Sequence, residues 1–172
     1  MKLSSKIILI SLCLTMISSL SGNTGEQRML KFFHTHTGDT LDVVYFQQGE
    51  YNPEALADIK VLLADWRDGK QHDIDPQVLD ILWRIQQATG STETWEVISA
   101  YRSPETNEML RKRSSGVAKK SQHLLGNAID VRLRGLDLEV LRDTARTLKL
   151  GGVGYYAGSN FVHVDTGRVR YW

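Results

Sequence analysis

Two histidines and one aspartate carry the chemistry that stands out in this sequence. His123 and Asp130 lie seven positions apart with Gly126 between them, and His163 follows further along the chain. Zinc hydrolases hold their ion through about three protein ligands, taken from neutral imidazoles and carboxylates, and leave a fourth position for water. The three residues supply that number and those types of ligand. Two imidazoles disfavour ions that take only oxygen ligands, so zinc is the first metal to consider.

Two short strands are expected to bring these ligands together. Residues 128–133 form an apolar run that predicts a buried strand, and Asp130 interrupts it. An unpaired carboxylate inside such a strand is costly, and metal ligation is one of the few arrangements that stabilise it. Residues 161–166 predict the closing strand, whose alternation puts His163 and Asp165 on one face. We expect His123 at the entrance of the first of these strands.

The remaining segments predict a scaffold of strands and helices in one domain. Residues rich in β-branched and aromatic side chains predict strands at 29–33, 40–46 and 95–102. Apolar residues at helical spacing, with capping residues, proline or glycine at the ends, predict helices at 53–69, at 76–90, from 104 onward and at 135–150. A chain of 172 residues is most simply a single domain with a sizeable core.

Several other residues invite a chemical explanation, but each has a simpler one. His34 and His36 lie beside the turn of the first hairpin, where exposed histidines are commoner than metal ligands, so we interpret them as surface residues. Trp66 and Trp83 lie on apolar helix faces and are expected to anchor the core. The glycine-rich segment 151–154 lacks the spacing of a phosphate loop and is interpreted as tight packing near the site.

The first 21 residues have the layout of a secretory signal peptide. A short basic region precedes an apolar run at 7–17, which is too short for a comfortable transmembrane span. We expect cleavage near Ser21, a polar lead-in at 22–28 and a periplasmic or cell-envelope location, with an uncleaved anchor as the alternative. The single cysteine, Cys13, lies inside the apolar run, so the mature chain is expected to have no disulfide.

The charge balance argues against nucleic acid as a partner. Twenty-one basic and 20 acidic side chains leave a formal net charge of +1, whereas nucleic-acid-binding domains carry a marked basic excess. Cations do gather locally in the stretch 111–121, which we interpret as a mobile loop at the rim of the site. These charges either attract acidic cell-wall polymers or are simply solvated.

Longer motifs resemble a known group of enzymes. The pattern Ser-x-His-x-x-Gly-x-Ala-x-Asp at 121–130, with the later His-Val-Asp at 163–165, resembles the zinc peptidases of the D-alanyl-D-alanine carboxypeptidase superfamily, which also includes the Hedgehog signalling domain. More closely, the chain is similar to the murein endopeptidase K (YcbK-like) family in four segments, 99–103, 116–123, 151–156 and 160–167. The resemblance covers about residues 29–172.

This resemblance implies a fold, an activity and roles for particular residues. The fold would be a single α+β domain, 29–172, with a central antiparallel sheet that carries the zinc and is flanked by helices. The activity would be hydrolysis of peptide bonds in peptidoglycan stems or cross-links. His123, Asp130 and His163 match the zinc ligands of the family, Arg102 matches an arginine that faces the scissile carbonyl, and Ser121 matches a serine near the substrate.

The residue that accepts the proton of the attacking water departs from the pattern of these relatives. Many of them have Glu or Asp three residues before the second zinc histidine, where this chain has Asn160. An amide cannot take a proton from water, so Asp165 is the substitute candidate, because it shares a strand face with His163. Its competing role is to accept a hydrogen bond from a ligand imidazole.

We therefore expect a zinc-dependent murein endopeptidase that hydrolyses peptidoglycan cross-links with a zinc-activated water. The expected partner is the peptide stem of peptidoglycan, bound by a monomer that has no nucleic-acid partner and no membrane contact beyond its export signal. Two alternatives stay open. One is a carboxypeptidase that removes terminal D-alanine, and the other is a secreted module that holds zinc and binds peptidoglycan without cleaving it.

Overall fold

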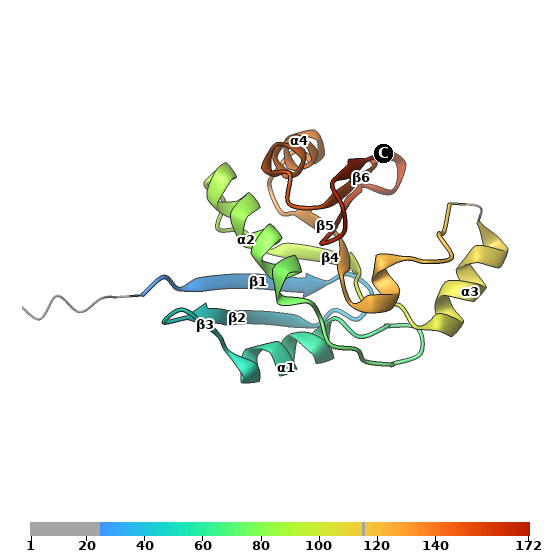
Figure 1. Ribbon diagram of the computed structural model, residues 1–172, viewed down its shortest axis with the longest axis horizontal. Coiled ribbons are helices and arrows are strands. Elements are labelled where there is room, and N and C mark those ends of the chain that lie inside the picture. Colours follow the sequence, from blue (N-terminus) through green and yellow to red (C-terminus); the bar gives the residue numbers. More distant parts are fainter. Residues whose placement is uncertain (1–24, 115) are drawn as a thin grey trace, which may run out of the picture.

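The protein is a sheet with helices packed around it, as a computed structural model shows (Figure 1). The structure describes residues 25–114 and 116–172, so the signal peptide expected at 1–21 lies outside the described residues. Within these ranges, the strands form one eight-stranded sheet with the order β3-β2-β1-β4-β5-β7-β6-β8. The same part of the chain has no helix with the length and apolar character needed to cross a membrane.

The bounds of the elements largely match the expected ones. The strands are β1 (Arg28–His34), β2 (Thr40–Gln47), β3 (Glu50–Tyr51), β4 (Trp95–Ser99), β5 (Ala128–Leu133), β6 (Gly152–Tyr156), β7 (Phe161–Asp165) and β8 (Arg170–Tyr171). The α-helices are α1 (Pro53–Leu62), α2 (Pro76–Thr89), α3 (Pro104–Arg113) and α4 (Leu138–Leu148). Two 3₁₀ turns, η1 (Gln122–Leu125) and η2 (Ala157–Ser159), precede β5 and β7.

The sheet is mixed, so the expectation of an antiparallel sheet is wrong at two places. β1 runs parallel to β4, and β6 runs parallel to β8, whereas the other neighbours are antiparallel. Parallel neighbours need a long crossover connection. Here α1 and α2 lie in the connection that separates the β1–β3 segment from β4.

Side-chain caps set where the helices begin. The side chains of Asn52, Asp75, Ser103 and Asp137 each accept a hydrogen bond from a backbone N–H in the first turn of the following helix. At its other end, α1 stops at Leu62, several residues before the expected end. Trp66 therefore lies outside the helix and is 37% exposed, so its interpretation as a core anchor is wrong. Trp83 packs partly buried against the core.

The core lies between the sheet and three of the helices. Buried side chains of α2 include Val78, Leu79, Leu82 and Ile85, and those of α1 and α4 include Ile59 and Leu141. α3 differs, because its buried side chains are the polar Thr106 and Asn107. Figure 1 shows α3 projecting from the body of the molecule, with the loop after it returning toward η1. We call α3 and residues 116–121 the arm.

Candidate metal centre

The centre is built where β5 and β7 lie side by side. Asp130 and His163 are partners in the antiparallel register, which places their side chains next to each other on one face. His123 was expected at the entrance of β5, and it lies in η1, the turn that directly precedes this strand. The Ser121 Oγ accepts a hydrogen bond from the His123 backbone N–H at 3.3 Å, and Gly126, with φ of 69°, ends the turn before β5.

The three expected ligands meet closely. The Nδ1 atom of His163 is 2.8 Å from Asp130 Oδ1, and His123 Nε2 is 3.3 Å from the same oxygen. The two imidazole nitrogens are 3.1 Å apart. All three ligand atoms lie within 4.8 Å of one another, and all three residues are buried. The tertiary structure thus assembles a group of the right type and number for a metal ion.

Each imidazole has one nitrogen in the cluster and one that faces away from it. The hydrogen bond of the outer nitrogen determines whether the inner nitrogen has a free lone pair. His123 Nδ1 is 2.6 Å from the backbone oxygen of Ala100, and His163 Nε2 is 2.8 Å from Asp165 Oδ2. Both partners are acceptors, so in the neutral rings these nitrogens carry the hydrogens. When both rings are neutral, two lone pairs and a carboxylate oxygen therefore converge on the centre. This donor set fits a divalent cation, and the outer acceptors orient both rings.

The same crowding shifts the ionisation of the cluster. Burial lowers the pKa of His123. Burial also acts to lower the pKa of His163, but hydrogen bonds to Asp130 and Asp165 outweigh it and raise that pKa to about 9. Burial acts to raise the pKa of Asp130, yet the neighbouring imidazoles hold it well below its usual range. The carboxylate therefore stays negative and attracts positive charge to the centre.

Asp165 lies behind His163, on the side of the ring away from the other ligands. Its carboxylate is fully buried, and Oδ1 accepts hydrogen bonds from the Gly167 N–H at 2.8 Å and from Arg170 Nη1 at 2.9 Å. Oδ2 accepts from His163 and, at 2.7 Å, from Arg170 Nη2. Burial acts to raise the pKa of Asp165, but the bonds from His163 and Arg170 hold it below its usual range. This geometry fits the hydrogen-bonding role that the sequence left open.

The cluster of His123, Asp130 and His163 opens into a cleft of about 680 Å³. On one side the cleft is lined by the arm, through Gly116, Val117, Ala118 and Lys120. On the other side it is lined by three aromatic residues of the β6–β8 region, Tyr156, Phe161 and Trp172. The basic stretch expected at the rim therefore does border the site, although α3 continues through Arg113 before the loop begins. Arg102 and Ser121 also line the cleft.

Arg102 is a buried cation with free hydrogen-bond donors beside the cluster. Its side chain is 11% exposed, and Nη2 lies 4.0 Å from Asp130 Oδ2. Nη1 donates to Asn107 Oδ1 over 3.4 Å, and Nε has no acceptor among the described residues. A guanidinium in this state is suited to bind an oxygen atom that enters the cleft.

The other histidines of the sequence argument do not join the cluster. His34 is fully buried, so its interpretation as a surface residue is wrong, because β1 lies in the sheet between β2 and β4. Its Nδ1 accepts a hydrogen bond from the His36 backbone N–H at 3.3 Å. His36 is exposed, and its ring stacks on Trp66 with the ring centroids 4.0 Å apart.

Asn160 occupies a turn that suits its residue type. It lies at the end of η2 with φ of 55°, and its side chain is exposed. Asparagine adopts this left-handed conformation more readily than most residues. The local backbone geometry therefore suits asparagine at this position.

Sequence reasoning missed two residues, Arg170 and Trp172, and the glycines of β6 were the available signal for them. A Cβ at Gly152 would overlap Arg170 and Asp165, and a Cβ at Gly154 would lie 2.6 Å from Trp172 Cε2. The interpretation of this segment as tight packing is thus confirmed. Which side chains pack there follows from the parallel pairing of β8 with β6, a long-range contact that local patterns do not reveal.

Comparison with known proteins agrees with this geometry. A family model described as Peptidoglycan L,D-endopeptidase MepK matches residues 22–172. The chain belongs to this family. It is 42% identical over 150 residues to the Peptidoglycan L,D-endopeptidase MepK of Escherichia coli (strain K12), which covers 87% of this chain and 82% of that relative. The motif-based resemblance is confirmed, and with it the expectation of a peptidase with an α+β fold.

A second relative supports the same assignment. The Probable peptidoglycan L,D-endopeptidase MepK of Haemophilus influenzae is 40% identical over 151 residues, covering 87% of this chain and 81% of the relative. The family model spans all of the described residues, including both strands that carry the candidate ligands. The likeness to the MepK family therefore extends over the fold as well as the short motifs around the ligands.

Proposed function

We propose that this protein is a zinc-dependent endopeptidase of the cell envelope that hydrolyses L,D peptide cross-links of peptidoglycan. The names of the MepK relatives supply the substrate class and the type of bond. One observation carries the metal-dependent part of the proposal. His123 Nε2, His163 Nδ1 and Asp130 Oδ1 converge beside a cleft, and outer hydrogen bonds leave both imidazole lone pairs facing the centre.

His123, Asp130 and His163 would hold the ion. Two imidazoles and one carboxylate form a ligand set that zinc uses in catalytic sites, where a further position remains for water. Bound there, zinc would act as a Lewis acid and lower the pKa of a water ligand toward ~7. Ala100 and Asp165 fix the two rings from outside, so little reorganisation is needed when the ion binds.

Arg102 would bind the carbonyl oxygen of the scissile amide. Its guanidinium lines the cleft beside Asp130, so a peptide that lies across the cluster brings its carbonyl within reach of this cation. Negative charge grows on that oxygen as the carbonyl carbon is attacked, and the fixed guanidinium stabilises it. Ser121 caps the turn that carries His123 and lines the same cleft, and we assign it a contact with the substrate.

We assign Asp165 an orienting role in place of the proton-accepting role considered from the sequence. The carboxylate has no exposed surface, and both of its oxygens already accept hydrogen bonds. It also lies behind the His163 ring, whose other nitrogen faces the cluster. A group so enclosed cannot reach a water molecule in the cleft, but it can hold the ring in the tautomer that ligation requires.

Digestion of purified peptidoglycan tests this function. The mature protein is incubated with and without a chelator, then with zinc restored, and the released muropeptides are identified by mass. We expect metal-dependent conversion of L,D-linked dimers to monomers. His123→Ala should abolish it, whereas His36→Ala, which removes an exposed imidazole outside the cluster, should not.

The other outcomes each identify an alternative. Release of alanine alone would make the protein a carboxypeptidase. A folded protein that holds stoichiometric zinc but cleaves nothing would be a binding module and would refute the peptidase proposal. Cleavage that survives the chelator and His123→Ala would refute the metal-dependent mechanism.

A further inference from the structure

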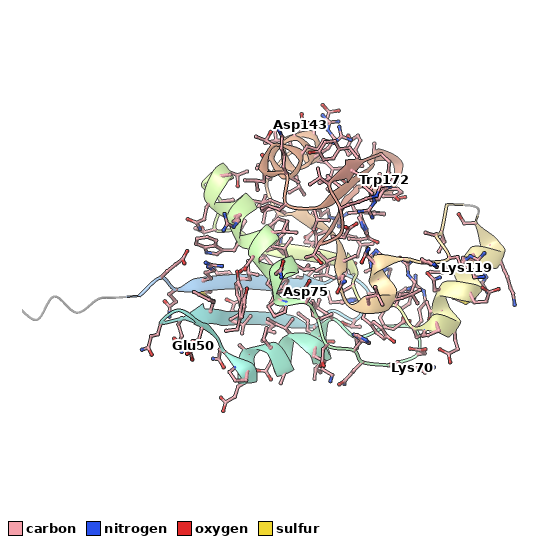
Figure 2. All side chains as sticks on the ribbon, in the orientation of Figure 1. Glu50, Lys70, Asp75, Lys119, Asp143 and Trp172 are labelled. Atoms are coloured by element: carbon pink, nitrogen blue, oxygen red, sulfur yellow. The ribbon has the colours of Figure 1, made fainter. Side chains whose placement is uncertain are left out.

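Trp172 lines the cleft, but no step proposed above uses it. Its indole centroid lies 5.3 Å from the imidazole centroid of His163. Nevertheless, Trp172 is 46% exposed, so a large aromatic surface faces solvent beside a metal ligand. Figure 2 shows Trp172 beside β6 and Lys119 on the arm. The indole thus belongs to the side of the cleft formed by β6 and β8.

The indole is held in place despite its exposure. Its Nε1 donates a hydrogen bond to the Tyr156 hydroxyl at 2.9 Å, and the Arg170 guanidinium lies 4.9 Å from the ring centroid. The backbone is fixed as well, because the Trp172 N–H donates to the Val153 oxygen and the Trp172 oxygen accepts from the Tyr155 N–H. A side chain positioned in this way loses little conformational entropy when a ligand packs against it.

Gly154 makes room for this arrangement. A Cβ at this position would lie 2.6 Å from Trp172 Cε2 and 2.7 Å from Nε1, closer than carbon atoms can pack. The φ angle of Gly154 is not in the left-handed region, so its backbone conformation does not itself require glycine. The indole is therefore the reason why a side chain is excluded there.

The surroundings of Trp172 indicate what it contacts. Tyr156 and Phe161 stack with their centroids 4.6 Å apart and line the cleft with it, so one wall is aromatic. Cationic Lys120 and Arg102 line the same cleft. A peptide that carries both methyl or methylene groups and free carboxylates matches such a site, because rings bind the former and cations the latter. Peptidoglycan stems have this composition.

We propose that Trp172 is a substrate-positioning residue that packs against the peptide stem of peptidoglycan and fixes its place relative to the metal cluster. This inference rests on the proposed function for the identity of the substrate. It concerns binding and not the chemical step. It therefore predicts a change in stem affinity and in KM, with little change in kcat or zinc content.

The first test replaces the indole. Binding of a purified muropeptide monomer, which has a stem but no cross-link to cut, is measured by calorimetry on the zinc-loaded protein. We expect Trp172→Ala to weaken this binding and raise KM for cross-linked dimers about tenfold, as loss of an aromatic anchor does. Trp172→Phe loses one modest hydrogen bond and should stay within about threefold of the unaltered protein. Zinc stoichiometry and melting temperature should hold.

Tyr171→Ala is the matched control. Tyr171, the last residue of β8, is an exposed aromatic residue next to Trp172, but its hydroxyl donates to the Arg146 oxygen and it does not line the cleft. This variant should keep the affinity for the stem. If both variants weakened binding equally, the effect would come from a disturbed β8 and the inference would fail.

A second test moves the indole without removing it. The methyl group of Gly154→Ala should displace Trp172 and reproduce the weaker binding of Trp172→Ala. In the double variant Gly154→Ala/Trp172→Ala, the methyl has no indole to displace and should add no further loss. A further loss in the double variant would show that the methyl acts on the strand itself, and it would contradict the inference.

The outcomes separate this inference from the proposed function. Unchanged stem affinity and KM in Trp172→Ala would overturn the inference while cleavage by the unaltered protein stands. Stem binding that depends on Trp172, in a protein that cuts no cross-link, would support the inference and overturn the peptidase. An unaltered protein that does not bind the stem would overturn the inference.

Discussion

Two carboxylate–arginine pairs lie at opposite halves of the sheet and have different surroundings. We call β3-β2-β1-β4 with α2 the Asp80 half, and β5-β7-β6-β8 the Asp165 half. In one half, Asp80 of α2 accepts hydrogen bonds from Arg28 at 2.6 Å, from the Tyr45 hydroxyl at 2.9 Å and from the Tyr51 hydroxyl at 2.7 Å. In the other half, Asp165 pairs with Arg170 and accepts from His163. Each carboxylate is stabilised by donors, as a shielded charge requires.

The two sites differ in the residues that bind each carboxylate and in what those residues contact on their other side. The partners of Asp80 are hydroxyl and guanidinium donors that tie α2 to β1, β2 and β3. The partner of Asp165 is an imidazole whose second nitrogen meets two more acceptors beside a cleft. A carboxylate–arginine pair by itself therefore does not indicate function. Two imidazoles and a carboxylate that face one another beside a cleft do, because together they form a group that could hold a cation.

Removal of a ligand should have the largest effect on the Asp165 half. His163→Ala leaves two ligand atoms, so we expect zinc to be lost and cleavage to fall by far more than the ~10²-fold that loss of a supporting residue costs. Zinc stoichiometry and the rate of dimer cleavage measure this. If the variant kept its zinc, His163 would not be a ligand.

Arg102→Ala should separate catalysis from metal binding within the same half. Loss of one preorganised donor to a developing oxyanion lowers kcat by ~10²–10³-fold. The zinc content should hold, since Arg102 is not among the three ligands. Steady-state kinetics with an L,D-linked dimer give the result, and an unchanged kcat would exclude Arg102 from the proposed role.

Asp165→Asn tests the outer carboxylate directly. The amide has one acceptor oxygen where the carboxylate has two, so it cannot accept from His163 at one position and from the Gly167 N–H and Arg170 Nη1 at the other. The His163 ring therefore loses the partner that fixes its tautomer. We expect metal affinity to fall by ~10–100-fold, measured by competition with a chelator. An Asp165→Asn protein with full metal affinity but no cleavage would instead restore the proton-accepting role.

Asp80→Asn is the corresponding change in the other half. It weakens the hydrogen bonds of a carboxylate whose side chain is 18% exposed, so the free energy of unfolding should fall by about 1.5–3 kcal/mol. Urea denaturation measures this loss. Zinc affinity and kcat should be those of the unaltered protein. A loss of zinc in Asp80→Asn would contradict the assignment of a purely structural role to Asp80.

The smallest expected effect is an alkaline weakening of the Asp80 half. Burial and Asp80 raise the pKa of Tyr51 to about 12, whereas an unfolded tyrosine titrates near ~10. The folded state therefore keeps a proton that the unfolded state loses. The resulting stability is complete below pH ~10 and declines as pH rises toward ~12. Urea midpoints should fall less steeply over this range in Tyr51→Phe, and equal slopes would contradict the prediction.

Local patterns predicted the elements well where the signal is itself local. Asn52, Asp75 and Ser103 cap helices that begin where the sequence placed them, because a cap needs only its own first turn. The same logic failed for Trp66, because helical spacing continues in the sequence after α1 has ended. It failed for His34 because burial depends on which strand lies beside β1.

The chemical types and spacing of His123, Asp130 and His163 were sufficient to suggest the metal ligands, since ligand chemistry belongs to the side chains themselves. The tertiary structure decided the rest of the site. Strand register places Asp130 opposite His163, the Ala100 oxygen and Asp165 set the two imidazole tautomers, and β8 brings Trp172 to the cleft. These contacts join residues far apart in the chain or depend on strand register, so their energies arise only when the sheet is assembled.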